Sequence, residues 1–195
     1  MTKASRPHPI EYMLAINQQK HAPLHIYSDE HVYFLTARCL EKKSFWDTDE
    51  KKKIFVSVFN KSIQKFDIRI YAWVLLNNHY HCLFQVDNFL CVGKFTNNLH
   101  SNSSRLLNDF DGESGRKMWY QYWDYCIRNE RDFWKHFNYI IQNPVKHGLV
   151  SSLGDAYYYK FSSNPVWFGR FGREGLDESF IKYPMRDWTP TIMDD

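Results

Sequence analysis

"IRIYAWVLLNNHYHCLFQV", residues 68–86, is the stretch that decides the fold. Two runs rich in β-branched and aromatic residues flank Asn77-Asn78. Asparagines tolerate the left-handed backbone of a tight turn, so the pattern predicts a β-hairpin. His79 and His81 begin the returning strand. Because successive side chains of a strand alternate between its faces, these two histidines point the same way, with Cα atoms roughly 6.6 Å apart. That geometry suits two ligands of one ion.

The segments on either side of this hairpin supply the other elements. Composition and periodicity predict further strands at 31–38 and 118–130, and helices at 49–66, 92–110 and 131–143. The last helix is expected to end before Pro144, because the residue preceding a proline avoids helical dihedrals. The order strand, helix, strand, strand, helix, strand, helix is typical of a ferredoxin-like split βαβ core with an antiparallel sheet and one added helix. We therefore expect an α+β fold.

Both ends of the chain differ in composition from this central part. Residues 1–25 are polar, contain three prolines and show no periodicity, so we expect an extended N-terminal arm. Residues 26–150 are expected to form the folded domain. Residues 151–195 are aromatic and show no regular pattern, and we expect them to be an irregular C-terminal extension packed on that domain.

Charge and composition narrow the functional classes. The net charge of +3 permits a polyanionic partner without requiring one. No phosphate-binding glycine loop follows a predicted strand, which argues against nucleoside triphosphate or dinucleotide chemistry. The four cysteines lack C-x-x-C spacing, and the first residues lack the apolar run of a signal peptide. No run reaches about 18 apolar residues. These features predict a reduced, cytoplasmic protein without a membrane partner.

A second pair of polar residues lies on the helix predicted at 131–143. Tyr139 and Asn143 are four residues apart, so they project from one face of that helix. A carboxamide oxygen, two imidazoles and waters would make an octahedral shell for Mg²⁺ or Mn²⁺, and imidazoles favour Mn²⁺. Tyrosine suits attack on a phosphodiester, because the resulting phosphotyrosine conserves the bond energy for reversal by the released 3′-hydroxyl.

Two blocks of sequence carry a resemblance to a known family: "YAWVLLNNHYHCLFQV" (71–86) and "YWDYCIRNERDFWKHFNYIIQNPVKHGLV" (122–150). Together they resemble the REP-associated tyrosine transposases, relatives of the IS200/IS605 single-strand transposases within the HUH nuclease superfamily. Family members carry M-P-N-H-x-H in the first block, and D-x-x-I-R and Y-I-x-x-N-P-V in the second. Here Leu76-Asn77 replaces Met-Pro, which alters the turn and keeps the histidines. "YKFSS" (159–163) is similar to the family's W-x-x-S-S segment.

The resemblance covers roughly residues 30–165 and implies a role for each matched residue. It makes 26–150 the catalytic domain, Tyr139 the nucleophile, and His79, His81 and Asn143 the ligands of Mg²⁺ or Mn²⁺. Asp124, Ile127 and Arg128 match the D-x-x-I-R element.

The resemblance also implies an activity and a substrate. The activity is that of a single-stranded DNA endonuclease and strand transferase, which cleaves at hairpin-bearing repetitive extragenic DNA through a 5′-phosphotyrosine. Such a protein would be a monomer or homodimer, cytoplasmic and associated with the nucleoid.

Several alternatives remain at this point. Arg105, Arg128 and Lys146 are candidates for phosphate contacts, although each also fits a solvated surface charge. The aromatic residues at 119–123 fit either base stacking or packing on a half-buried strand. The protein could be a domesticated hairpin-DNA-binding protein without turnover. It could also be a metal hydrolase with an activated water, for which the sequence offers no carboxylate base near the histidine pair.

Overall fold

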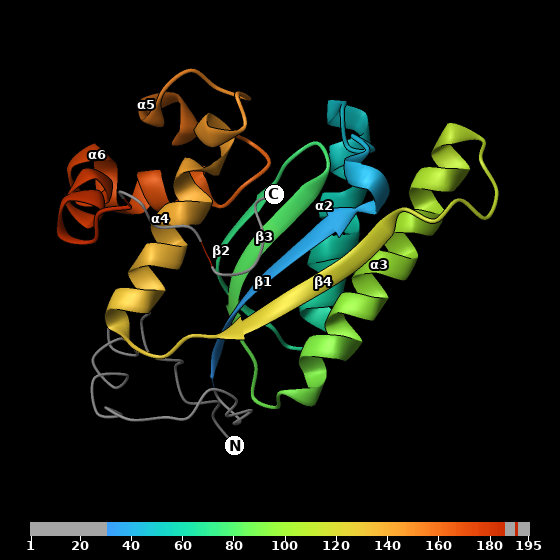
Figure 1. Ribbon diagram of the computed structural model, residues 1–195, viewed down its shortest axis with the longest axis horizontal. Coiled ribbons are helices and arrows are strands. Elements are labelled where there is room, and N and C mark those ends of the chain that lie inside the picture. The colour runs from blue at the N-terminus through green and yellow to red at the C-terminus, as the bar shows by residue number, and fades with distance from the viewer. Residues whose placement is uncertain (1–30, 186–189, 191–195) are drawn as a thin grey trace.

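A four-stranded antiparallel sheet organises the part of the chain that the computed structural model describes, residues 31–185 and residue 190 (Figure 1). Its strands are β1 (Val32–Cys39), β2 (Arg69–Leu75), β3 (His79–Gln85) and β4 (Trp119–Cys126). Their spatial order is β2-β3-β1-β4, and each neighbouring pair is antiparallel. Each crossover therefore skips one strand, as in a split βαβ unit, and the predicted ferredoxin-like α+β fold is confirmed.

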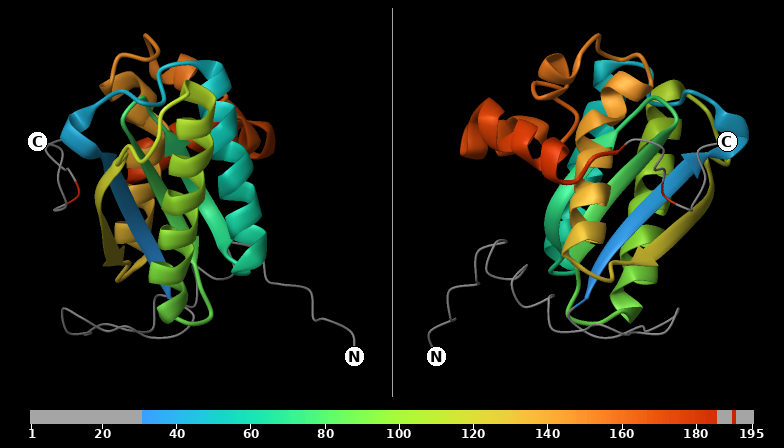
Figure 2. Two further views of the ribbon diagram at one scale, coloured as in Figure 1. Left: turned by 90° about the vertical axis from the view of Figure 1, so that its right-hand side faces the viewer. Right: turned by 60° about the vertical axis from the view of Figure 1, so that its left-hand side comes forward.

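Helices cover both faces of the sheet. On one face α2 (Asp49–Lys65) packs beside α3 (Leu90–Asp111), and on the other α4 (Glu130–Lys146) crosses β2 and β3 (Figures 1 and 2). The chain also forms η1 (Leu40–Lys42), α5 (Leu153–Ala156) and α6 (Asn164–Lys182). Within the described ranges no helix is long and apolar enough to cross a membrane.

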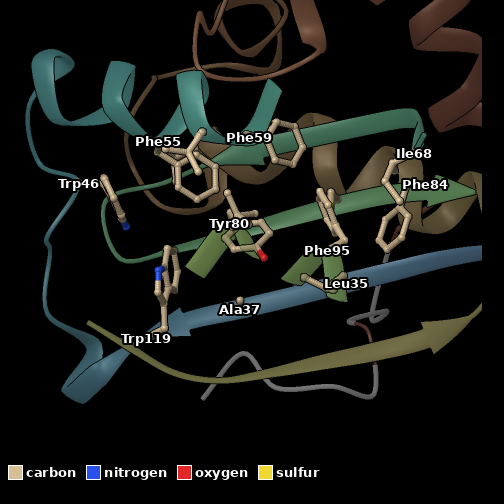
Figure 3. Close-up of a cluster of buried hydrophobic side chains, with 14 of the residues drawn as sticks. Leu35, Ala37, Trp46, Phe55, Phe59, Ile68, Tyr80, Phe84, Phe95 and Trp119 are labelled. Atoms are coloured by element: carbon tan, nitrogen blue, oxygen red, sulfur yellow. The ribbon is translucent and has the colours of Figure 1, made fainter. Parts of the chain in front are cut away.

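An aromatic core fills the space between the sheet and α2 and α3 (Figure 3). Phe55 of α2 lies between Trp46 and Tyr80, with ring centroids 5.3 and 5.1 Å away. Phe84 meets Phe95 of α3 at 5.6 Å. Each such ring contributes roughly 1.5–3 kcal/mol when it leaves water. Since Tyr80 and Phe84 face this core, the alternation of β3 directs its odd-numbered residues toward α4.

The helix α4 is longer than the sequence predicts. Asn129 caps its start by accepting a hydrogen bond from the Asp132 N–H at 3.0 Å. The expected stop before Pro144 is wrong, because the helix continues to Lys146. A proline keeps helical φ and removes one N–H, and here the bond that is lost belongs to the last turn. The extra turn adds one more set of side chains to the face that meets the sheet.

The C-terminal segment is also more regular than expected. Residues 164–182 form α6, with a break at Gly172, where φ is 65°. The glycines of this segment weaken its helical pattern in the sequence, whereas packing of Trp167 and Leu176 against the α4 side of the core stabilises the helix. The expected irregular extension is thus wrong for these residues. The extended arm expected at 1–25 lies outside the described residues.

Candidate active site

Backbone and side-chain hydrogen bonds together hold the turn between β2 and β3. The left-handed backbone expected at Asn77-Asn78 is wrong, because neither residue has a positive φ. Instead, the Leu76 N–H donates to the His79 carbonyl at 2.9 Å, and the Asn78 amide nitrogen donates to the Lys42 carbonyl at 3.0 Å. The asparagines thus tie the hairpin to the segment after β1.

His79 is the first residue of β3 and is buried on the α4 side of the sheet. Its Nδ1 lies 2.6 Å from Oδ1 of Asn78. A carboxamide oxygen only accepts, so this contact places the ring proton on Nδ1 and leaves the lone pair on Nε2. The His79 ring lies 4.9 Å from that of His81, centroid to centroid, so the two imidazoles share one site as the alternation predicts.

His81 is held in the same manner from β1. Its Nδ1 lies 2.7 Å from Oγ1 of Thr36, the residue opposite it in the sheet. Burial, reinforced by neighbouring positive groups including His79 and His147, holds the pKa of His81 well below the ordinary value of 6.5. The ring is therefore neutral at pH 7, and no described residue makes a hydrogen bond to its buried Nε2.

The facing surface of α4 presents Tyr139 and Asn143, and the C-cap residue His147 follows four residues after Asn143. The Tyr139 ring lies 5.2 Å from that of His81, and the His147 ring lies 4.6 Å from that of His79. Asn143 stands between them and so faces the histidine pair. Its amide nitrogen donates to the Tyr139 carbonyl at 3.4 Å, whereas its buried Oδ1 accepts no hydrogen bond from any described residue.

This donor set fits a divalent ion. Two buried polar atoms, His81 Nε2 and Asn143 Oδ1, lack hydrogen-bond partners in the described part of the chain, and such atoms are costly unless a ligand or water satisfies them. Residues 31–185 and 190 hold no group of three His, Cys, Asp or Glu side chains that could bind an ion. An ion here would therefore depend on the asparagine oxygen and waters, a shell that suits Mg²⁺ or Mn²⁺.

The predicted phosphate-contacting cations occupy three different places. Lys146 lies over the Tyr139 ring, with Nζ 5.0 Å from the centroid. Arg128 stacks on Tyr125, with its guanidinium carbon 5.3 Å from the centroid, just before α4 begins. Arg105 is exposed on α3, across the sheet from α4. Of the three, only Lys146 lies beside the tyrosine and the histidines.

The sequence patterns do not predict the role of four residues at this site. Thr36 and Arg38 reach it because β1 pairs with β3 in a register that sets them opposite His81 and His79. Asn78 acts through its bond to His79, and His147 extends the Tyr139 and Asn143 spacing by one more turn. A four-residue spacing could have indicated His147, but strand register becomes known only in the folded sheet.

The fold and the site together define an α+β protein in which a strand-borne histidine pair faces a helix-borne tyrosine and asparagine, a group suited to phosphodiester chemistry. A family model described as IS200-like transposase matches residues 28–140, a range that includes His79, His81 and Tyr139. The chain belongs to the IS200-like transposase family.

Relatives within that family agree with the resemblance seen in the sequence. A REP-associated tyrosine transposase of Escherichia coli (strain K12) is 32% identical over 127 residues, which cover 64% of this chain and 65% of the relative. A Haemophilus influenzae chain described in the same way is 26% identical over 140 residues, 67% of this chain and 79% of the relative. The match to the E. coli relative thus spans slightly less than two thirds of its length.

One solved structure is similar in fold. It is described as a REP-associated tyrosine transposase bound to a REP hairpin, and it aligns with a TM-score of 0.59 at 24% identity. The alignment covers 90% of this chain and 94% of that chain. At this identity the likeness concerns the fold.

Proposed function

We propose that this transposase-family chain is a single-stranded DNA endonuclease and strand transferase that acts through a 5′-phosphotyrosine on Tyr139. The observation that carries the proposal is the position of the Tyr139 ring, 5.2 Å from His81 and on the same helix face as Asn143. A nucleophile and the candidate ligands of an ion thus converge on one point, as covalent catalysis on a phosphodiester requires.

The chemistry follows from these side chains. The Tyr139 oxygen attacks the scissile phosphorus, the 3′-oxygen of the upstream strand leaves and takes up a proton, and the 5′-phosphate stays joined to the tyrosine. Attack by a 3′-hydroxyl reverses the step and rejoins DNA. His79, His81 and Asn143 would hold Mg²⁺ or Mn²⁺, which polarises the phosphate when bound. Asn78 and Thr36 fix the orientation of the two imidazoles.

Lys146 would supply positive charge beside the nucleophile. Tyr139 exposes 1% of its surface, whereas Lys146 is exposed and its ammonium lies over the tyrosine ring. A phosphate bound at the site would pair with this ammonium, which brings the cation to the DNA backbone. Arg38, opposite His79 in the sheet, would contact the same phosphate.

The proposed substrate is hairpin-bearing repetitive DNA, cut in a single strand near the hairpin. The E. coli and H. influenzae relatives are described as REP-associated, and the solved structure of similar fold is described as bound to a REP hairpin. These descriptions concern those proteins, and they support hairpin DNA as the first substrate to test for this chain.

The test is formation of a covalent adduct. The purified chain is incubated with labelled single-stranded hairpin oligonucleotides and Mn²⁺, and a denaturing gel then reveals any protein-DNA band. We expect a band that disappears with Tyr139→Phe and with His79→Ala. Tyr158→Phe serves as the matched control, because Tyr158 is 64% exposed and lies outside the site; it should keep the band.

Gel-shift measurements on the same oligonucleotides separate the alternatives. Tyr139→Phe should bind hairpin DNA as the unsubstituted chain does, because the lost hydroxyl serves the chemistry and the phosphate contacts remain. Binding without any adduct in the unsubstituted chain would identify a hairpin-binding protein without turnover. Cleavage that survives Tyr139→Phe without an adduct would identify a metal hydrolase.

A further inference from the structure

Lys52 is a buried lysine that the proposed chemistry does not use. It lies in the first turn of α2, on the opposite side of the sheet from α4, and exposes 6% of its surface. Its Nζ donates to Oδ1 of Asn77 at 2.7 Å and lies 5.5 Å from the centroid of the Phe161 ring. One side chain therefore joins α2 to the turn of the histidine hairpin and to the C-terminal segment.

The group that receives this bond belongs to a turn held at several points. The Asn77 carbonyl accepts from the Trp46 N–H at 2.9 Å, and the Asn78 carbonyl accepts from the Cys39 N–H at 2.7 Å. Those bonds fix the backbone of the turn. The bond from Lys52 holds the Asn77 side chain two residues before His79, so the turn that leads into β3 is also tied to α2.

Burying the Lys52 ammonium carries a desolvation cost. Burial lowers the pKa of Lys52, an effect that nearby Asp49 and Asp47 oppose. An apolar side chain would pack against Phe161 without that desolvation cost. The bond to Asn77 Oδ1 is the contact that a lysine makes here and that an apolar side chain could not replace.

We propose that Lys52 is a positioning residue for the ion site. Its bond to Asn77 fixes the β2–β3 turn, and the fixed turn holds Asn78 and His79 in the arrangement that directs His79 Nε2 toward His81 and α4. The effect on ion binding rests on the proposed function. The effect on the turn rests on the hydrogen bonds alone.

The test is a double-mutant cycle on Mn²⁺ affinity. Lys52→Met and Asn77→Ala each remove the same bond, so each should raise the Mn²⁺ dissociation constant, by less than the roughly 10-fold that loss of a direct partner of a metal-ligating histidine costs. The double variant should lose no more than either single one, because one bond is shared. Lys53→Met removes the same charge from the adjacent, exposed position and should leave the affinity unchanged.

A second readout needs neither metal nor DNA. The ring ¹⁵N resonances of His79 in the metal-free protein report whether Nδ1 keeps the proton that it shares with Asn78. Lys52→Met and Asn77→Ala should shift or broaden these resonances, and Lys53→Met should not. Should Lys52→Met fail to fold, Asn77→Ala removes the bond from the turn and leaves α2 intact.

The outcomes separate this inference from the proposed function. Unchanged His79 resonances in both bond-deleting variants would overturn the positioning role, and so would a lower melting temperature with unchanged Mn²⁺ affinity. A chain that binds no Mn²⁺ at all would overturn the ion in the proposed function, and the His79 resonances would still decide whether Lys52 positions the turn.

Discussion

The hydrogen bonds behind the two histidines control the site at the scale of single residues. Each imidazole offers Nε2 to the site because its Nδ1 is engaged, by Asn78 for His79 and by Thr36 for His81. Such partners orient a ligand and raise its basicity. The site therefore depends on side chains that would not touch the ion themselves.

Thr36→Val is the direct test of this support. The substitution keeps the shape of Thr36 and removes its hydroxyl, so the His81 ring loses its partner at 2.7 Å. We expect the Mn²⁺ affinity, measured by calorimetry, to fall about 10-fold. Thr96→Val is the matched control, because Thr96 is equally buried but bonds to the Val92 carbonyl within α3. Equal losses in both variants would point to a general loss of stability.

His100 makes the stability of the protein depend on pH. It stacks on Trp119 with centroids 4.5 Å apart, and burial lowers its pKa from 6.5 to about 3. Between pH 6.5 and about 3, His100 is therefore protonated in the unfolded chain and neutral in the folded chain. The free energy of unfolding consequently falls as the pH drops from 6.5 toward 3. His81 acts in the same direction.

The expected slope from His100 is at most about 1.4 kcal/mol per pH unit. His100→Gln removes the titrating group, so urea unfolding between pH 6.5 and 4.5 should become less dependent on pH by up to that amount. A slope equal to that of the unsubstituted chain would show that His100 is protonated in the folded state.

At the scale of elements, the position of α4 matters most, because it carries Tyr139 and Asn143. Buried hydrogen bonds attach it to α6. The Asn138 amide nitrogen donates to the carbonyls of Ser179 and Tyr183 at 2.9 and 3.2 Å, and the Ser179 hydroxyl donates to Asn138 Oδ1 at 2.7 Å. Asn138 directly precedes the proposed nucleophile, so the C-terminal helix sets the place of the helix that bears it.

Asn138→Ala should therefore destabilise the protein by about 2–3 kcal/mol, because it removes three buried hydrogen bonds that join α4 to α6, each worth roughly 1 kcal/mol. Denaturant unfolding measures this loss. Asn97→Ala, at an exposed position of α3, provides the same substitution outside the contact and should change the unfolding free energy by less than about 0.5 kcal/mol. A small effect at Asn138 would mean that α6 contributes little to the placement of α4.

At the scale of the whole molecule, the segment after residue 150 packs on the domain that the sequence patterns predict to end there. Trp167 of α6 donates from Nε1 to the Tyr71 carbonyl of β2 at 2.6 Å and packs on Phe137 of α4 at 5.3 Å. Its indole thus belongs to the core that lies under the site. We expect residues 26–150 and the segment after them to unfold together.

Trp167→Ala should lower the free energy of unfolding by about 3–5 kcal/mol through the cavity that it leaves. Val166→Ala, at a 67% exposed neighbour, should cost under about 0.5 kcal/mol. Far-UV and near-UV circular dichroism should follow one coincident transition in the unsubstituted chain. Two separate transitions would show that the segment after residue 150 forms its own folding unit.

Local patterns in the sequence were sufficient for the elements of the sheet and for the resemblance. Short-range patterns in the sequence predict the alternation of β3, the order of strands and helices, and the spacing of Tyr139 and Asn143. Three expectations failed: the left-handed backbone at Asn77-Asn78, the helix stop before Pro144 and the irregular segment at 164–182. Pro144 removes one hydrogen bond close to the end of α4, and the helix continues to Lys146. The glycines of α6 weaken its helical pattern in the sequence, whereas packing stabilises the helix.

Tertiary structure alone decided which side chains complete the site. Thr36 and Arg38 join it through the β1–β3 register, His147 through its place at the C-cap of α4, and Lys52, as proposed, through its bond from α2 to the β2–β3 turn. Each of these contacts joins residues distant in the chain. Strand register and helix placement arise from the packing of a whole core, so no local pattern specifies them.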